Sequence, residues 1–378
     1  MKRSLIILSS EQFGYLTDTL KYCQYAFSEF SITYVGWDYG KPRIQLPAVN
    51  AIYVSREGNL AMRNAKLLYT FHKEIKSKQP DVIFANYTRG ISIVKLLNRK
   101  SNFILDIRTL SVNKKSNVRL WYNTLLKFEL SFFKEISVIS EGVARLLKLK
   151  NYYLLPLGGE CFCTFSKSFD KLAFLYVGTF ENRNMIKCIE AFHLYLAKNT
   201  SREPPPTFTI IGGPDGAELA EVKRYIKEHN LENQIITTGP LRQDQLRPFF
   251  EQANIGISYI PIKPYYDFQP STKTFEYLIS GLPVIATTTH ENSKIVDHSC
   301  GILAGDSVEA FADGLNKIET GKDRFNSDFI RRKYKQYSWK YIVKNYFLTM
   351  INKIAEVNSQ AEIDEQRSIT GRLFSKER

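Results

Sequence analysis

The sequence predicts an α/β protein made of two consecutive domains, each with a parallel sheet covered by helices. Three observations lead to this fold class. The chain of 378 residues is longer than one core usually organises. Short apolar runs alternate with segments of helical periodicity, an order typical of parallel strands joined by helices. The alternation restarts at Ala173, after a junction within residues 156–171.

The first series of elements fills the N-terminal half. Short apolar runs indicate strands, and longer segments with apolar residues at every third or fourth position indicate helices. We expect strands at Ser4–Leu8, Ile32–Val35, Ala51–Val54, Val82–Ala85, Phe103–Ile107 and Ile136–Ile139. We expect helices at Thr17–Phe30, Leu60–Lys78, Gly90–Asn98, Val118–Phe133 and Glu141–Leu149.

The second series begins with a strand at Ala173–Val177 and a helix at Met185–Lys198, which cannot continue through the prolines of Glu203–Pro206. Further strands are expected at Phe208–Ile211, Gln234–Thr237, Ile255–Ser258 and Pro283–Ala286. These elements predict domains at residues 1–160 and 161–340, a helix at 341–358, and a polar, disordered tail at 359–378.

The charge is concentrated in the first half of the chain. The net charge is +14, and residues 1–165 contain 24 Lys and Arg against 12 Asp and Glu, whereas the remainder is nearly balanced. This asymmetry predicts an anionic partner, either membrane lipid, a phosphorylated acceptor or nucleic acid. A basic surface that serves only solubility is the alternative. No nucleic-acid-binding motif accompanies the charge, so we expect no nucleic acid partner.

The composition also limits the chemistry. No apolar run approaches the roughly 18 residues of a membrane span, so we expect a cytoplasmic protein. The five cysteines are expected to be thiols in a reducing compartment. No His/Cys cluster at metal-ligand spacing and no Asp-x-Asp motif occurs, so we expect neither a metal nor a cofactor.

Three loops after expected strands are candidates for a ligand site, because ligands of open parallel sheets bind beyond the carboxyl ends of the strands. They cover residues 178–184, 212–216 and 268–276. In the third, Pro270 suits the first turn of a helix, and Ser271 and Thr272 can cap its amides. The start of such a helix, next to Lys273, suits a diphosphate, and Glu276 one turn later can accept hydrogen bonds from sugar hydroxyls. An ordinary capped helix is the alternative.

The segment from Gln269 to Ala286 resembles the donor-site signature of family 4 glycosyltransferases (group 1 type), which have the GT-B fold. The matching residues are Pro270 and Lys273, then Glu276-Tyr277-Leu278, then Gly281-Leu282-Pro283-Val284-Ile285. Further matches follow in the family's order at Tyr176–Thr179, Thr209–Gly213, Thr237–Leu241, Ala253–Ile257 and Tyr337–Trp339.

The resemblance implies two facing Rossmann-like domains with a cleft between them, and a C-terminal helix that crosses back to the first domain. It implies a retaining transferase that moves a sugar from UDP or GDP to a glycan or lipid-linked acceptor in surface polysaccharide biosynthesis. The nucleotide sugar is then a co-substrate, bound by the second domain, while the first domain binds the acceptor. Another GT-B activity, such as an inverting transferase or a nucleotide-sugar epimerase, remains open, as does a non-catalytic scaffold.

The resemblance also implies roles for residues. Glu276 would hold the ribose hydroxyls, amides at Ser271–Thr274 the diphosphate, and Arg183 with Lys273 would balance the donor phosphates. The full set of implied donor-binding residues is Gly178, Thr179, Arg183, Gly212, Gly213, Gly239, Pro270, Ser271, Thr272, Lys273, Thr274 and Glu276. The implied catalytic residues are Arg183, Lys273, Glu276 and Arg108.

The sequence departs from the family pattern at two positions. Phe268 stands where relatives commonly carry a second glutamate that meets the transferred sugar, and the nearest carboxylate is Asp267. Thr179 stands where an arginine is usual. Both departures bear on the identity of the sugar and on activity itself.

Candidates on the acceptor side follow expected strands of the first half: Gly14, Asn86, Arg89, Asp106 and Arg108. Arg108 lies near the position of a catalytically important histidine in relatives. A structural, salt-bridged arginine is an equal alternative.

The expected helix at Val118–Phe133 is basic and aromatic. Leu120, Trp121, Thr124, Leu125, Phe128 and Phe132 share one face. This face predicts either peripheral contact with an anionic membrane or packing of the helix on its own sheet.

Overall fold

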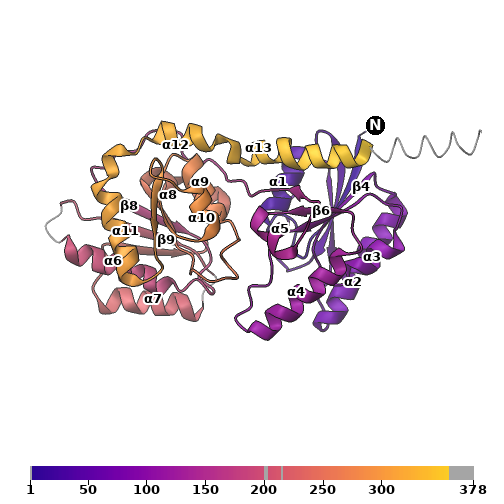
Figure 1. Ribbon diagram of the computed structural model, residues 1–378, viewed down its shortest axis with the longest axis horizontal. Helices are drawn as coiled ribbons and strands as arrows, with labels where there is room; N and C mark the ends of the chain where they lie inside the picture. Colours follow the sequence, from indigo (N-terminus) through magenta and orange to yellow (C-terminus); the bar gives the residue numbers. More distant parts are fainter. Residues whose placement is uncertain (1, 200–202, 214–215, 357–378) are drawn as a thin grey trace, which may run out of the picture. The chain divides into compact units, whose positions relative to one another are not determined.

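The computed structural model describes residues 2–199, 203–213 and 216–356 (Figure 1). The described residues divide into two compact units, the first formed by residues 2–156 and 342–356 and the second lying within Leu157–Tyr341. The expected tail at 359–378 lies outside the described residues, as do Pro214 and Asp215 of the second candidate loop.

The first unit contains a parallel sheet, whose described strands are in the order β3-β2-β1-β4-β5-β6-β7. The strands are β1 (Arg3–Leu8), β2 (Phe30–Trp37), β3 (Val49–Val54), β4 (Val82–Asn86), β5 (Phe103–Ile107), β6 (Glu135–Val138) and β7 (Tyr153–Leu154). The helices are α1 (Thr17–Ala26), α2 (Leu60–Lys78), α3 (Ile91–Leu97), α4 (Ser116–Leu130) and α5 (Glu141–Leu147). The central strands are buried and apolar, as strands covered on both faces must be.

The second unit contains a parallel sheet of the same kind, whose described strands are in the order β10-β9-β8-β11-β12-β13. The strands are β8 (Ala173–Val177), β9 (Thr207–Ile211), β10 (Ile235–Gly239), β11 (Ile255–Ser258), β12 (Val284–Thr287) and β13 (Gly301–Ala304). The helices are α6 (Met185–Lys198), α7 (Ala217–Glu228), α8 (Arg247–Gln252), α9 (Thr272–Ile279), α10 (His290–Ile295), α11 (Val308–Thr320), α12 (Ser327–Tyr334) and α13 (Trp339–Ile342). Short 3₁₀ turns lie at Gln243–Gln245, Lys322–Arg324 and Lys335–Tyr337.

After α13, the chain returns to the first unit. A π-helical stretch at Val343–Phe347 continues into helical residues 348–356. The Phe347 ring stacks on Tyr22 of α1 at 4.4 Å between centroids and meets Phe84 of β4 edge-on at 5.1 Å. This aromatic contact fixes the end of the chain to the first unit.

The predicted α/β class is confirmed, with two local corrections. The first helix ends at Ala26 rather than Phe30, because Phe30 is buried as the first residue of β2. In addition, the face that α4 buries is not the aromatic face identified in the sequence. The buried residues of α4 are Leu126, Glu129 and Leu130, whereas Leu120, Trp121 and Phe128 are 56–70% exposed.

Candidate functional site

The strand order places a switch point between β8 and β11 in the second unit and between β1 and β4 in the first. Connections leave these neighbouring strands in opposite directions, which opens a crevice at their carboxyl ends. The loop after β8 and the start of α9 carry the expected donor-site residues of the second unit.

Lys273 lies directly over the loop after β8. A Cβ atom at Gly178 would lie 2.3 Å from Nζ and 2.8 Å from Cε of Lys273, so the end of the lysine side chain would have to move if another residue stood there. Nζ also lies 4.5 Å from the centre of the Tyr176 ring. Burial, with a smaller contribution from the positive charge of Arg183, lowers the pKa of Lys273 to about 7, while Glu276 acts in the opposite direction. The site thus holds a lysine that titrates near neutrality.

Arg183 supplies a second cation at the same end of β8. Its guanidinium carbon lies 4.6 Å from the centre of the Tyr266 ring. The flanking residues Asn182 and Asn184 have φ angles of 59° and 55°, which asparagine tolerates better than most side chains. The Asn182 amide donates to Oε1 of Glu218 at 3.1 Å, which fixes the loop to α7.

The start of α9 differs in one respect from the sequence-based expectation. Ser271 occupies the N-cap position, but its side chain makes no capping hydrogen bond. The Thr274 amide donates instead to the Ser271 carbonyl oxygen at 3.1 Å. The Thr274 hydroxyl is buried between Oγ of Ser258 at 2.7 Å and Oδ1 of Asn292 at 3.2 Å. Thr274 therefore anchors α9 to the strand and helix beside it.

Tyr277 sets the position of α9 on the sheet. Its ring occupies the space above Gly256 of β11, where a Cβ atom would lie 2.3 Å away. Its hydroxyl accepts a hydrogen bond from the Val177 amide at 2.9 Å. Glu276, one residue earlier, is buried, and a Cβ atom at Gly159 would lie 2.8 Å from its amide nitrogen. These contacts hold Lys273 and Glu276 in a fixed register with the end of β8.

Glycines bring the loops after β8, β9 and β10 close together. A Cβ atom at Gly212 would lie 1.9 Å from the Gly178 carbonyl oxygen, and one at Gly213 would lie 3.0 Å from the Pro240 ring. The Gly212 amide donates to the Gly239 carbonyl oxygen at 3.1 Å. Gly239 has a φ angle of 76°, a conformation that favours glycine. These expected site glycines thus permit a backbone approach that side chains would block.

The two departures from the family pattern have defined environments. The Phe268 ring lies 4.8 Å from the His290 ring. Oδ1 of Asp267 accepts a hydrogen bond from the His290 amide at 2.7 Å, so the nearest carboxylate holds the start of α10. The Thr179 carbonyl oxygen accepts a hydrogen bond from the Tyr176 hydroxyl at 2.8 Å. Pro270 lies between Phe268 and α9, partly exposed.

In the first unit, Asn86, Asp106 and Arg108 come together at the carboxyl ends of β4 and β5. Asp106 is fully buried and accepts hydrogen bonds from Ser137 Oγ at 2.7 Å and from Asn86 Nδ2 at 2.9 Å. Burial raises its pKa to about 6 against the opposing effect of Arg108. Arg108 pairs with Asp18 at 2.5 Å and donates to the Leu155 carbonyl oxygen at 2.6 Å. Arg108 thus forms a buried ion pair, and its part in catalysis stays a prediction.

The other acceptor-side candidates lie apart from this network. Gly14 has a φ angle of 91°, and a Cβ atom there would lie 2.4 Å from Cδ1 of Ile44. The Arg89 guanidinium carbon lies 4.6 Å from the centre of the Tyr122 ring.

Sequence reasoning missed a group of charged and aromatic residues after β1, β2 and β3. The Arg56 guanidinium carbon lies 3.8 Å from the Tyr39 ring centre, and Lys41 Nζ lies 4.6 Å from that of Tyr15. Burial raises the pKa of Glu11 in the same group, although Lys41 and Arg56 act to lower it. Their position after neighbouring strands of a parallel sheet is the signal that identifies them as candidates.

Within the described residues, no group of His, Cys, Asp or Glu has the geometry of a metal site. No helix in the described ranges is both long and apolar enough to cross a membrane.

Comparison with known structures identifies the fold class. Sucrose-phosphate synthase from Thermosynechococcus elongatus matches with a TM-score of 0.74 at 17% identity, over 95% of this chain and 100% of that chain. The apo lipopolysaccharide outer core galactosyltransferase WaaB matches with a TM-score of 0.67 at 15% identity, over 93% and 100%. HepE from Anabaena in complex with UDP matches with a TM-score of 0.62 at 14% identity, over 95% and 100%. The chain thus has the GT-B fold, as expected.

The sequence of the second unit resembles a known family. Residues 171–320 match the family model described as glycosyl transferases group 1. No curated protein matches the sequence significantly. The match lies within the second unit, and the similarity to solved structures over the whole chain shows the fold.

Proposed function

We propose that this protein transfers a sugar, with retention of anomeric configuration, from a UDP- or GDP-sugar to a glycan or lipid-linked acceptor. The proposed setting is surface polysaccharide biosynthesis in the cytoplasm, at the inner face of the membrane. Solved relatives with UDP or a UDP-sugar analogue, and the lipopolysaccharide galactosyltransferase among them, support this class of donor and acceptor.

One observation carries the donor assignment: two cations, Lys273 and Arg183, gather where β8 ends and α9 begins. Burial lowers the pKa of Lys273, repulsion from the neighbouring cation Arg183 lowers it further, and an anion bound between the two cations relieves this repulsion. The start of a helix also binds phosphate through its free amides. Glu276, fixed one turn into α9, is proposed to accept hydrogen bonds from the ribose hydroxyls.

The proposed mechanism relies on the departing diphosphate. Negative charge grows on the diphosphate as the bond to the sugar breaks, while positive charge develops on the sugar. Protonated Lys273 and Arg183 bind the leaving group more strongly as its charge grows, which lowers the barrier selectively. We propose that these cations act without a metal or cofactor. Asn86, Asp106 and Arg108 are proposed to shape the acceptor side, with Gly14 and Arg89 in the surrounding loops.

The donor assignment is tested by thermal unfolding with UDP, GDP, ADP and CMP. A nucleotide at about 100 times its dissociation constant stabilises by about 2.7 kcal/mol, which raises the midpoint by a few degrees. We expect one diphosphate to produce this shift in the wild type and in the control Lys187→Gln, which changes an exposed lysine of α6. The shift should disappear in Glu276→Ala. A folded wild type that responds to none of the nucleotides would refute the donor site and favour a non-catalytic scaffold. The presence of Phe268, where relatives commonly carry a glutamate, also favours a scaffold.

Product analysis separates transfer from epimerisation. The protein is incubated with the nucleotide sugar whose base gave the shift, without any acceptor, and the sugar is followed by proton NMR. A transferase leaves the configuration of the sugar unchanged apart from slow hydrolysis. Appearance of an epimeric nucleotide sugar would replace the proposed reaction with the alternative GT-B activity.

A further inference from the structure

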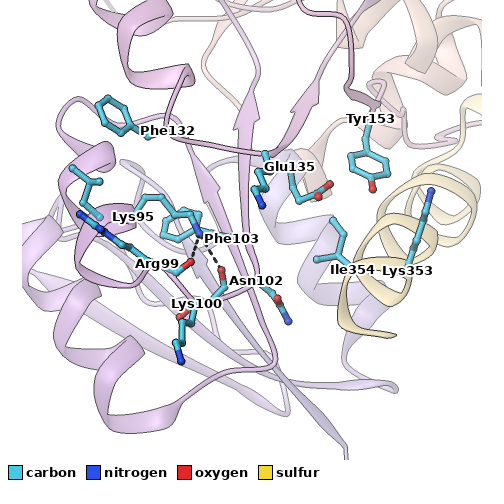
Figure 2. A pocket seen from close by; sticks show the side chains of 13 residues that line it. Lys95, Arg99, Lys100, Asn102, Phe103, Phe132, Glu135, Tyr153, Lys353 and Ile354 are labelled. Carbon is cyan, nitrogen blue, oxygen red and sulfur yellow. Dashed lines mark hydrogen bonds between the residues drawn. The ribbon is translucent and has the colours of Figure 1, made fainter. Parts of the chain in front are cut away.

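A basic pocket of about 450 Å³ lies in the first unit, away from the residues discussed above (Figure 2). It is formed by the end of α3 and the loop to β5, the turn between α4 and β6, the start of β7, and the last described turn of the C-terminal helix. The cationic residues that line it are Lys95, Arg99, Lys100, Lys134 and Lys353.

The pocket lies at the amino-terminal ends of the strands, whereas the acceptor-side candidates lie at or after their carboxyl ends. Phe103, Glu135 and Tyr153 line it, and each is the first residue of its strand, β5, β6 or β7. Asn86 and Asp106 lie at or near the carboxyl ends of parallel strands in the same sheet. Parallel sheets usually bind their substrates in a crevice at the carboxyl ends of the strands, so this pocket is a separate site.

The positive charge in the pocket is poorly compensated. The lining residues include one carboxylate, Glu135, which interacts with the Tyr153 hydroxyl. The pKa of Tyr153 is raised mainly by burial and, to a smaller extent, by Glu135. Lys95 donates to the carbonyl oxygens of Arg99 and Ser101, both at 3.1 Å (Figure 2). Burial, and then the charge of Lys134, lower the pKa of Lys95. An anion in this pocket would relieve the repulsion between these cations.

The surface beside the pocket is apolar. Leu96, which lines the pocket, is 41% exposed, and its neighbours on α3, Ile93 and Leu97, are 59% and 55% exposed. Ile93 and Leu97 line a separate groove with residues of α2 and α4, including Trp121. On the other side, Phe132 of the pocket contacts the exposed Phe128 ring at 5.4 Å between centroids. A phosphate group could thus bind in the basic pocket while a hydrocarbon chain contacts the apolar surface beside it.

We propose that the basic pocket binds a phosphate ester, of the kind carried by the headgroup of an anionic phospholipid or by a free sugar or glycerol phosphate. Lys134, Lys353 and Arg99 supply the charge, and Lys95 is held in the pocket by its hydrogen bonds to two backbone carbonyl oxygens. This site is separate from the proposed donor site and does not depend on the proposed transfer.

The test compares two double variants that remove the same charge. Lys134→Gln with Lys353→Gln alters the pocket, and Lys76→Gln with Lys150→Gln alters exposed lysines of the same unit that do not line it. Binding of sn-glycerol 3-phosphate and of inorganic phosphate is measured by calorimetry. Binding to phosphatidylglycerol vesicles is measured by sedimentation, with digalactosyldiacylglycerol vesicles charged to the same extent by oleate as a phosphate-free anionic surface.

The pocket predicts a loss of about tenfold or more in phosphate affinity for the pocket variant, and less than twofold for the control. If binding to phosphatidylglycerol falls in parallel and binding to the oleate vesicles does not, the source is a lipid headgroup. If only the soluble ester is affected, the source is a free phosphate compound. Equal losses in both variants, or no loss in either, would overturn the proposal. Nucleotide-induced thermal shifts are recorded for every variant, so failure of the donor site is seen separately.

Discussion

Lys273 is the residue on which the proposed donor site most depends. A lysine with a pKa near 7 is largely deprotonated in mildly alkaline solution, because burial and Arg183 both oppose its charge. An incoming diphosphate reverses this balance, since it favours the ammonium form. Ligand binding and protonation of Lys273 are therefore linked: a bound diphosphate raises the pKa of Lys273, and protonation of Lys273 raises the affinity for the diphosphate.

Nucleotide affinity should fall as the pH rises above 7. The ligand binds the protonated form of Lys273, and the population of this form decreases above its pKa in the free protein. We expect the dissociation constant for the cognate diphosphate to increase roughly tenfold between pH 7 and pH 8.5. Calorimetry over this range measures the effect, and it should also show proton uptake that grows with pH.

Two substitutions test whether Lys273 is the titrating group. Lys273→Arg keeps the charge at every pH in the range, so its affinity should be nearly independent of pH. Lys273→Gln should bind weakly, also without pH dependence. A wild-type slope that persists in Lys273→Gln would assign the titration to another group.

Arg108 joins three elements of the first unit. It pairs with Asp18 of α1, lies 3.7 Å from Asp106 of β5, and donates to the Leu155 carbonyl after β7. Both carboxylates are nearly inaccessible to solvent. Removal of Arg108 takes a cation away from two buried carboxylates, which is among the costliest changes that a core can undergo.

Arg108→Met should lower the free energy of unfolding at pH 7.5 by about 3 kcal/mol. Burial already raises the folded-state pKa of Asp106 to about 6, and loss of Arg108 raises it further. A carboxyl whose folded pKa exceeds its unfolded value destabilises the protein only where it ionises, so the defect should shrink as the pH falls toward 4.5. Urea unfolding at both pH values measures this difference.

A catalytic role for Arg108 predicts a different result. A group that touches the reacting sugar can be replaced with little change in stability but with a large loss in turnover. If Arg108→Met unfolds like the wild type at pH 7.5 and yet loses activity, the ion-pair role described here is wrong.

Periodicity predicted most elements of the fold because buried parallel strands are short apolar runs and their connecting helices are amphipathic. Strand β7 was not predicted because a strand of two residues is too short to show a periodic pattern. Strand β13 was not predicted because its sequence, Gly301–Ala304, resembles a continuation of the preceding loop. The start of α9 was located from Pro270 and Ser271, but sequence cannot show that the Ser271 hydroxyl leaves the helix uncapped. A salt bridge of Arg108 could be named only as an alternative, and its partners Asp18 and Asp106 could not be assigned, since Asp18 is distant in sequence.

At the scale of the whole molecule, exposed apolar side chains and positive charge occur on the same unit. Figure 1 shows α2, α3 and α4 on the outer part of the first unit. Their exposed apolar residues are Leu60, Met62, Tyr69, Ile93, Leu96, Leu97, Leu120, Trp121 and Phe128. Large exposed apolar patches in monomeric proteins usually mark an interface with another protein or a membrane. The excess charge of residues 1–165 favours an anionic membrane as that interface.

The exposed face of α4 should therefore contribute to membrane binding without contributing to stability. Replacement of Leu120 and Trp121 by serine removes apolar area that is already in contact with water, so thermal unfolding should change little. The same change should weaken sedimentation with anionic vesicles by about tenfold or more at low salt, because buried apolar area drives interfacial binding.

Leu126→Ser is the matched control on the same helix. Leu126 is 3% exposed, so this variant should lose several kcal/mol of stability while the exposed apolar side chains of α4 remain unchanged. If the wild type fails to sediment with anionic vesicles at low salt, membrane contact through this face is excluded. If the Leu120 and Trp121 variant instead proves strongly destabilised, the aromatic face packs against protein, as one of the two sequence-based alternatives held. The pattern expected for a membrane surface is a loss of binding at constant stability in one variant, and a loss of stability at constant binding in the other.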